Sequence, residues 1–296
     1  MRKDVIHFMK WAWVAAVVIF IAFLVQRRHA EFLEALQQIH VFYLFLSFIF
    51  ILAAKVVLPL FMQYVVQSIG KSMDFWTCFR IYSITQLGKY MPGNIWHFVG
   101  KAAEYKSHNF SLGNVRDALV IENAWLVLSA FVYGLLLVTV FEFELIKSLF
   151  TSHSYLIIFF IALIFLVLLL AKNLLKINFK KILSDYRLNL RIVLLQLAVW
   201  TLLGLGFAVL AMPFLLQEVS ILMLVGLYAV AFSIGFITPF APAGVGVREA
   251  ILALGLLPYV PLEIVIIVSV ANRLLYLLVE IILASVACLM PKKVYA

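Results

Sequence analysis

Two basic residues lie in the middle of long apolar runs, where a charge needs a partner. Lys55 falls inside the run 41–69, and Arg273 falls near the middle of 262–289, with Glu280 two turns further along the same helical face. A cation at the centre of a bilayer costs about 2.5–3.5 kcal/mol on insertion scales. Two interpretations stay open: an internal Arg273–Glu280 ion pair, or a polar cavity where Lys55 and Arg273 hold an anionic group. Arginine suits phosphate because its planar fork donates two hydrogen bonds.

Further polar residues lie where apolar stretches are interrupted by proline and glycine. One interruption, at 88–94, divides the stretch 75–100, and the other, at 238–246, divides 221–258. Broken backbone at membrane depth leaves N–H and C=O groups unpaired, and it is tolerated only where protein or a wet cavity covers it. A surface loop between two ordinary helices is the alternative. We favour re-entrant hairpins, whose tips contain Pro92, Gly93, Pro242, Gly244 and Gly246.

The two tips carry different polar groups. The first offers a cation, an amide and an imidazole in Lys89, Asn94 and His97, although an isolated histidine is often a satisfied polar group without a catalytic role. The second offers Arg248 and Glu249 directly after small residues. If a helix starts after this tip, its N-terminal N–H groups would form an anion site supported by Arg248, and its dipole would stabilise Glu249.

Composition decides the class of protein that positions these residues. Of 296 residues, 66% are apolar and 12% are charged, against about 45–50% and 25% in soluble domains. A soluble domain could not bury so much apolar surface, and several runs reach the roughly 18–20 residues of a spanning helix. The sequence therefore predicts an all-α polytopic membrane protein. The net charge of +9 fits the charge bias of membrane loops better than nucleic-acid binding, so no nucleic-acid partner is expected.

The apolar runs predict about six crossings in a single transmembrane domain, residues 1–296. The first run, which ends at 25, resembles a signal peptide, but basic residues stand where a cleavage site should lie, so we predict a retained helix. If both hairpins return to the side they enter, most of the 23 lysines and arginines fall on one side, which predicts cytoplasmic termini. The other crossings are expected at 41–69, 117–141, 154–171, 192–216 and 262–289.

Matching spacing in the two broken stretches indicates an internal repeat. At a shift of about 150 residues, Pro92 lines up with Pro242 and Glu122 with Asn272. Three crossings per half is an odd number, so the halves would be inverted relative to each other. Inverted repeats whose broken helices meet near the midplane are typical of transporters. The halves are expected at about 1–147 and 150–296.

Enzyme signatures and metal-ligand clusters are missing from the sequence. It has no DxD, HExxH, GxxxxGK[ST] or GxSxG motif, and its four aspartates fall at the ends of apolar runs. Cys78 and Cys288 are isolated and read as inert thiols. We therefore predict no metal, no cofactor and no assigned catalytic residue. An enzyme is the weaker hypothesis, although a membrane enzyme can work with one base and one cation.

At both tips the chain resembles the lysylphosphatidylglycerol synthase/flippase transmembrane-domain family. The resemblance rests on Met91-Pro92-Gly93-Asn94 and on Pro-Ala-Gly-Val-Gly-Val-Arg-Glu-Ala at 242–250. It continues through Leu257-Pro258-Tyr259 and Asn272-Arg273 and covers essentially the whole chain. Many relatives carry Gly-Glu soon after the early Pro-Gly, where this chain has Trp96-His97, which indicates a subfamily.

The resemblance implies an integral protein of the cell (inner) membrane that handles anionic or polyprenyl-linked lipids. Full-length synthases in the family carry a soluble C-terminal aminoacyl-transfer domain and use the membrane part to flip the product. Here the sequence ends at 292–296, directly after the last predicted helix, so synthase activity is not expected. Other relatives are associated with glycan assembly, which makes glycan-assembly enzymes possible partners.

Residues and resemblance together lead us to expect a lipid translocase of the cell envelope. The headgroup of an anionic lipid or a polyprenyl-phosphate-linked sugar would pass between the inverted halves while its tails stay in the bilayer. Lys55, Arg248 and Arg273 would hold the phosphate in turn. The other substrate-binding residues are expected to be Lys89, Asn94, His97, Glu122, Glu249 and Asn272.

Two alternatives remain at this point. One is a membrane-embedded transferase acting on a lipid-phosphate sugar, with His97 or Glu104 as the base. The other is an accessory subunit that holds a glycan-assembly enzyme and has no activity of its own.

Overall fold

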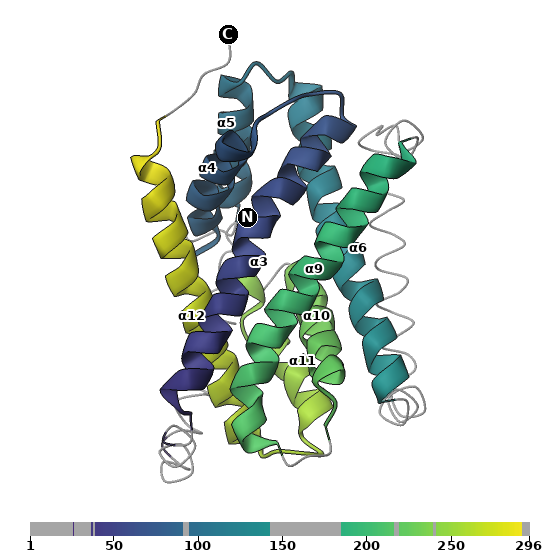
Figure 1. The fold of residues 1–296 in the computed structure, drawn as a ribbon, viewed down its shortest axis with the longest axis vertical. Helices are drawn as coiled ribbons and strands as arrows, with labels where there is room; N and C mark the ends of the chain where they lie inside the picture. The colour runs from purple at the N-terminus through teal and green to yellow at the C-terminus, as the bar shows by residue number, and fades with distance from the viewer. Residues whose placement is uncertain are drawn as a thin grey trace, which may run out of the picture.

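Four long helices form the frame of the molecule. The structure, a computed structural model, describes residues 26, 37, 39–90, 95–142, 185–215, 219–238 and 241–291. Throughout these residues the regular elements are helical. The long helices are α3 (Val41–Ser68), α6 (Leu112–Phe141), α9 (Tyr186–Ala211) and α12 (Leu262–Leu289), and Figure 1 shows them running along the longest axis of the molecule.

Each long helix is apolar and long enough to cross a membrane. The α3 helix has 28 residues, about 42 Å at 1.5 Å per residue, which exceeds the roughly 30 Å hydrocarbon core. The four spans, with α9 extended through Phe214, have mean hydropathies between 2.1 and 2.5. The predicted all-α polytopic membrane class is thereby confirmed. The number of crossings is not, because the predicted first run and the crossing at 154–171 lie outside the described residues.

Polar caps, rather than hydropathy, set the first residue of two of the long helices. The α6 helix begins at Leu112, earlier than predicted, because the Ser111 hydroxyl accepts a hydrogen bond from the Asn114 N–H. The α9 helix begins earlier too, where the Asp185 carboxylate accepts from the N–H groups of Arg187 and Leu188. The polar first turns of these helices were invisible to a search for apolar runs.

Two pairs of shorter helices lie inside this frame. The first pair is α4 (Phe75–Gln86) and α5 (Trp96–Ser107), with the 3₁₀ turn η1 (Leu87–Tyr90) after α4. The second is α10 (Ile221–Ile237) and α11 (Val247–Leu256), with η3 (Pro242–Gly244) between them. These arms have 10–17 residues, short of the roughly 20 that a crossing needs. This favours hairpins over two ordinary helices joined by a loop.

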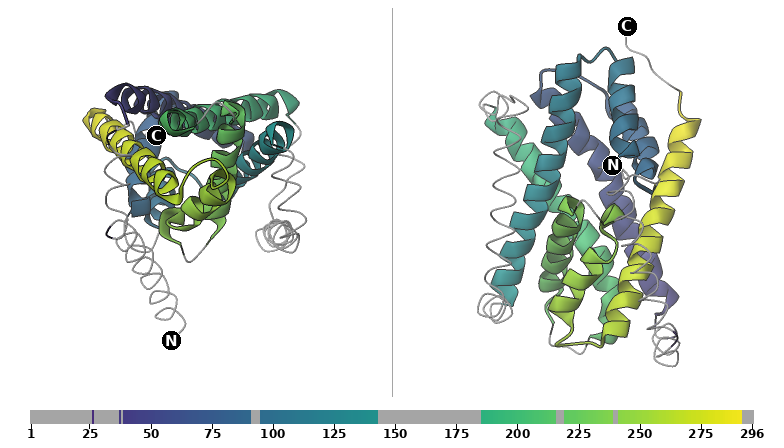
Figure 2. Two further views of the ribbon diagram at one scale, coloured as in Figure 1. Left: turned by 90° about the horizontal axis from the view of Figure 1, so that it is seen from below. Right: turned by 180° about the vertical axis from the view of Figure 1, so that it is seen from behind.

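The two hairpins enter from opposite ends, and their tips meet in the middle. Figures 1 and 2 show the α4–α5 pair in one half of the molecule and the α10–α11 pair in the other. The turns η1 and η3 contact each other between them. Pro92 and Gly93 of the first tip lie outside the described residues, whereas Pro242, Gly244 and Gly246 form the turn of the second.

The second set of helices repeats the first in the opposite direction. The chain runs along α3, into the middle and back through α4–α5, and then down α6. It then runs down α9, into the middle and back through α10–α11, and up α12 (Figure 2). This is the arrangement expected of an inverted repeat. The boundaries of its two halves, at about 147 and 150, stay a prediction.

Glycines bring α10 close to two long helices, α6 of the first half and α9 of its own half. A methyl group at Gly134 on α6 would lie 2.6 Å from the carbonyl oxygen of Gly226 on α10, and the reverse substitution would be equally close at 2.7 Å. At the crossing of α9 and α10, a methyl group at Gly204 would lie 2.7 Å from Val225. Small residues of this kind allow close backbone approach between helices in lipid. The crossings fix α10, and with it the second hairpin tip.

Basic residues gather at one end of the molecule. That end holds the link from α3 to α4 and the first turns of α6 and α9. The opposite end contains no lysine or arginine in its described segments, 39–45, 137–142, 208–215, 219–224 and 254–264. The basic residues at the first end are Lys71, Lys106, Arg116, Arg187 and Arg191.

Candidate functional site

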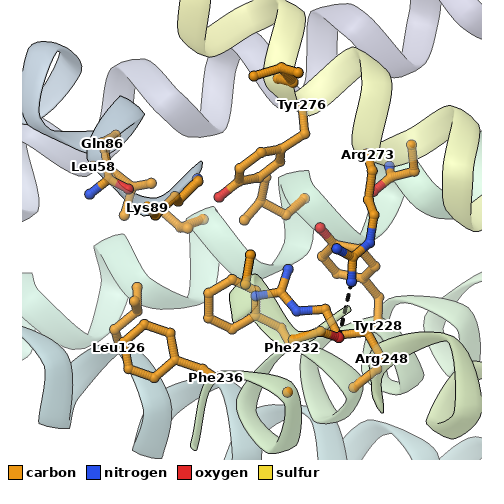
Figure 3. A pocket seen from close by; sticks show the side chains of 18 of the residues that line it. Leu58, Gln86, Lys89, Leu126, Tyr228, Phe232, Phe236, Arg248, Arg273 and Tyr276 are labelled. Atoms are coloured by element: carbon orange, nitrogen blue, oxygen red, sulfur yellow. Dashed lines mark hydrogen bonds between the residues drawn. The ribbon is translucent and has the colours of Figure 1, made fainter. Parts of the chain in front are cut away.

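A cavity of about 280 Å³ lies where the two hairpin tips meet. Side chains from both hairpins and from all four long helices line it, so the cavity belongs to the fold as a whole and to no single helix (Figure 3). The charged residues of its wall are Lys89, Lys101, Glu122, Arg248, Glu249 and Arg273.

The structure brings most of the predicted site residues to this one cavity. Gly244 of the second tip lines it too. Lys55 does not line the cavity, and its ammonium group binds Glu280 behind the wall. Asn94 is outside the described residues. The predicted side chains that line the wall are Lys89, His97, Glu122, Arg248, Glu249, Asn272 and Arg273. Their roles in binding stay predictions.

Glu280 on α12 is the centre of a buried polar cluster beside the cavity. Its Oε1 accepts hydrogen bonds from the ammonium groups of Lys55 on α3 and Lys89 on η1, each at 2.5 Å. Its Oε2 accepts from the Tyr90 hydroxyl at 2.9 Å. The Lys55 ammonium also lies 3.7 Å from the centre of the Tyr276 ring. The cluster therefore ties the first hairpin tip to two long helices.

The internal Arg273–Glu280 ion pair, one of the two interpretations of the sequence, is wrong. Arg273 pairs with Glu249 on α11, with Nε 2.6 Å from Oε1. The two residues do share a helical face, but they lie two turns apart, and each turn meets a different neighbour. Glu280 meets α3 and η1, whereas Arg273 meets α11.

The same pair holds the turn of the second tip. Glu249 accepts a hydrogen bond from the Gly246 N–H at 2.7 Å, and Arg273 donates to the Gly244 carbonyl at 3.1 Å (Figure 3). The turn has positive φ angles at Ala243 (50°), Gly244 (70°) and Gly246 (82°), a conformation that glycine adopts without strain. Glu249 thus takes the Gly246 N–H at the start of α11, and the anion site expected from the other N–H groups there stays a prediction.

A second ion pair mirrors this one in the first half. Lys101 on α5 donates to Glu122 on α6, with Nζ 2.6 Å from Oε1. In each half, therefore, the returning arm of the hairpin is joined to the next long helix by an ion pair. The signs are exchanged: the arm carries the cation in the first half, and Glu249 supplies the carboxylate in the second.

Arg248 is the cavity cation that lacks an opposite charge among the described residues. Its guanidinium lies 4.3 Å from the centre of the Phe232 ring, and its Nε has no hydrogen-bond partner in the described part of the chain. Gly235 and Gly244 make room for its stem, because a methyl group there would lie 2.5 Å from its Cγ and 2.9 Å from its Nε. The Arg248 side chain thus passes between two glycines to reach the cavity.

Several other residues of the cavity wall also carry a buried polar atom with no partner among the described residues. More than nine in ten buried polar groups in proteins are hydrogen-bonded, so such a concentration indicates a site that a polar ligand or water completes. The atoms are Nδ1 of His97, Oε2 of Glu122, Oγ of Ser269 and Nδ2 of Asn272.

Sequence reasoning missed several functional residues. Lys101 is buried, yet it was not selected, because its helix is short and polar. Tyr90 and Tyr276 were not selected either, since an aromatic residue in or beside an apolar helix is ordinary. Glu280 was noticed, but only as a partner of Arg273, although a carboxylate within an apolar run can pair with any helix packed against it. No group of three residues able to hold a metal occurs in the described segments.

Comparison with known families agrees with the membrane-spanning helices of the fold. The model of the lysylphosphatidylglycerol synthase TM region matches residues 11–284, which include both hairpins and the whole cavity wall. The chain belongs to this family. As a member of the lysylphosphatidylglycerol synthase TM family it is a multi-pass membrane protein of the synthase/flippase group. None of the curated proteins matches the chain significantly.

Proposed function

We propose that this protein is a lipid translocase that carries a phosphate-bearing headgroup through the cavity while the acyl or prenyl tails stay in the bilayer. One observation carries the proposal: a cationic cavity lies where two oppositely directed hairpins meet. Broken helices that meet near the midplane are the usual site of transport in inverted-repeat proteins. Membership of the family supports this proposal, because the family is named after a synthase of a phospholipid, lysylphosphatidylglycerol.

The charges of the site favour an anionic ligand. Its wall carries four cations and two carboxylates, and the cluster behind it adds Lys55 and Glu280. Two positive charges are therefore in excess among the described residues. An uncompensated charge away from water is strongly unfavourable, and a bound phosphate would compensate it.

The size of the cavity favours a headgroup without its tails. Sites for drug-sized ligands have volumes of about 300–1,000 Å³, so a cavity of about 280 Å³ holds one phosphate and a small attached group. The wall also presents the rings of Tyr228, Phe232 and Tyr276, which provide apolar surface beside the cations (Figure 3). This mixture suits a polar group that enters from a lipid environment.

We further propose that the protein lies in the cell membrane with its basic end on the cytoplasmic side. Cytoplasmic segments near membrane crossings carry an excess of lysine and arginine. The end that holds Lys71, Lys106 and Arg116 has this excess, and the described segments of the other end have none. The first hairpin would then enter from the cytoplasm and the second from outside.

The transferase alternative is favoured by one feature, the position of His97. This side chain lines the cavity, and its Nδ1 is without a partner among the described residues, as a base awaiting a substrate would be. Glu104, the other proposed base, is not part of the cavity wall and lies 3.9 Å from Arg80.

Reconstitution into vesicles tests the proposal. Purified protein in vesicles with a phospholipid that carries its fluorophore on an acyl chain should accelerate the loss of fluorescence to an impermeant quencher. Arg248→Gln should slow this loss by about tenfold or more, as expected when a charged hydrogen bond of about 1.5–3 kcal/mol is removed. Arg187→Gln removes an exposed arginine and should leave the rate unchanged. A wild-type rate equal to that of empty vesicles would refute translocation, and product formation from a labelled lipid donor would favour the transferase.

A further inference from the structure

The two excess positive charges of the cavity come from different hairpin tips. Lys89 belongs to η1 of the first tip, and Arg248 follows the turn of the second. Both residues line the cavity, and so does Tyr276 (Figure 3). The other two cations of the wall, Lys101 and Arg273, each have a carboxylate of their own.

The excess charge at the first tip follows from the geometry at Glu280. Lys55 and Lys89 share a single oxygen of this carboxylate, at the same distance of 2.5 Å. When both lysines are protonated, one carboxylate balances only one of the two ammonium groups, and one positive charge is left over. The Lys55 side chain is 1% exposed and does not reach the wall, whereas that of Lys89 is 16% exposed and forms part of it. The surplus charge therefore faces the cavity through Lys89.

We infer that the cavity recognises a lipid phosphate with two or more negative charges, a phosphomonoester or a diphosphate, in preference to a phosphodiester. This inference rests on the proposed function and names the substrate class of its site. A phosphomonoester carries a charge of about −1.5 to −2 near pH 7 and three terminal oxygens, which one ammonium and one guanidinium fork can share. A phosphodiester carries a single charge and would leave one of the two cations unbalanced.

Binding to the detergent-solubilised protein tests this charge preference. Phosphatidic acid and phosphatidylglycerol with identical acyl chains are titrated while the shift in the unfolding temperature is recorded. Phosphatidic acid should bind about tenfold more tightly or better. Pyrophosphate should compete with it, but more weakly than the lipid binds, since the proposed ligand is a lipid. Equal affinities for the two lipids would overturn the inference, and tighter binding of pyrophosphate than of phosphatidic acid would overturn the assignment to a lipid.

Variants distinguish the effect of the net charge of the site from the effect of direct contact with the ligand. Lys89→Gln and Arg248→Gln should each abolish most of the preference, and Arg248→Lys should retain part of it because the charge remains. Lys55→Met is the sharpest test, because it removes the surplus charge without altering the cavity wall and should also reduce the preference. Lys106→Gln and Arg187→Gln remove exposed cations and should change nothing. A full preference in Lys55→Met and Lys89→Gln protein that elutes as a single species would overturn the inference.

Translocation measured with the same two lipids distinguishes this inference from the proposed function. Selective binding of phosphatidic acid without transport would refute the translocase and support the charge preference of the site. Transport of both lipids at equal rates and with equal affinities would overturn the charge preference and leave the translocase standing.

Discussion

At Glu280, one carboxylate accepts hydrogen bonds from three side chains that lie far from it in the sequence. Glu280 is 3% exposed and Lys55 is 1% exposed, so these two groups cannot exchange their contact for water. Removing one member of a buried ion pair is much more harmful than replacing the whole pair with apolar groups. The cluster is therefore the most sensitive point of the polar interior.

We predict that Glu280→Gln destabilises the protein by about 3–5 kcal/mol, because it leaves two buried ammonium groups without a counter-charge. Unfolding in mixed micelles titrated with sodium dodecyl sulfate measures the change. Asp117→Asn makes the same chemical change in the more exposed Arg116–Asp117 pair and should cost less than about 1 kcal/mol. The double variant Lys55→Met/Glu280→Gln should recover part of the lost stability, and a double variant less stable than Glu280→Gln would contradict this account.

A second prediction concerns Gly235, which leaves room for the stem of Arg248. In Gly235→Ala the new methyl group would lie 2.5 Å from Cγ of Arg248, so the guanidinium must move from its position over Phe232. Lipid transport should fall nearly as far as in Arg248→Gln, while the helical circular dichroism stays unchanged. Gly113→Ala, where the new methyl group would lie 3.8 Å from the Ser111 hydroxyl oxygen, is the matched control. A transport rate equal to that of the wild type would show that the position of Arg248 does not matter.

Residue identity predicted the members of the site better than their partners. Intramembrane charge and tip position were enough to select Lys89, Arg248 and Arg273 as cavity residues, because a polar group in an apolar run must face protein or water. Glu122 was selected by its equivalence to Asn272 in the internal repeat. The pairing of Glu280 with α3 and η1 was not predictable, because it depends on how elements distant in sequence cross. Without those contacts, the nearest helical-face neighbour was the natural choice for Arg273.

At the scale of elements, helix type and position followed largely from apolar runs and from proline and glycine. The predicted last crossing coincides with α12, Leu262–Leu289, and the run 41–69 coincides with α3 to within a residue. Pro59 lies inside this run, and α3 continues through it as one helix. A proline removes only its own hydrogen bond to the preceding turn, and packing against α9 and α12 holds the rest.

The crossing of α6 with α10 yields an element-scale prediction. Gly226→Ala would place a methyl group 2.7 Å from the backbone oxygen of Gly134, and backbone cannot rotate away as a side chain can. The two helices must separate, which should destabilise the protein by about 1–3 kcal/mol, the range typical of overpacked cores. Unfolding in mixed micelles measures it, again with Gly113→Ala as the control. Equal stability in Gly226→Ala would mean that the close approach is not required.

For the molecule as a whole, two features support each other. The order of long helix, hairpin and long helix occurs twice in opposite directions, and basic residues lie at one end of the resulting bundle. Both follow if each hairpin enters from a different face of the membrane. The position of the cavity then follows too, because tips that enter from opposite faces can meet only in the interior.

Accessibility of single cysteines tests this arrangement most directly. In a background with Cys78→Ala and Cys288→Ala, one cysteine replaces Lys71 in the link between α3 and α4, and another replaces Leu257 after α11. Intact cells are treated with a membrane-impermeant maleimide before and after permeabilisation. The account predicts that Leu257→Cys reacts in intact cells and that Lys71→Cys reacts only after permeabilisation. Reaction of both positions from the same side would contradict the opposed hairpins and the cavity between them.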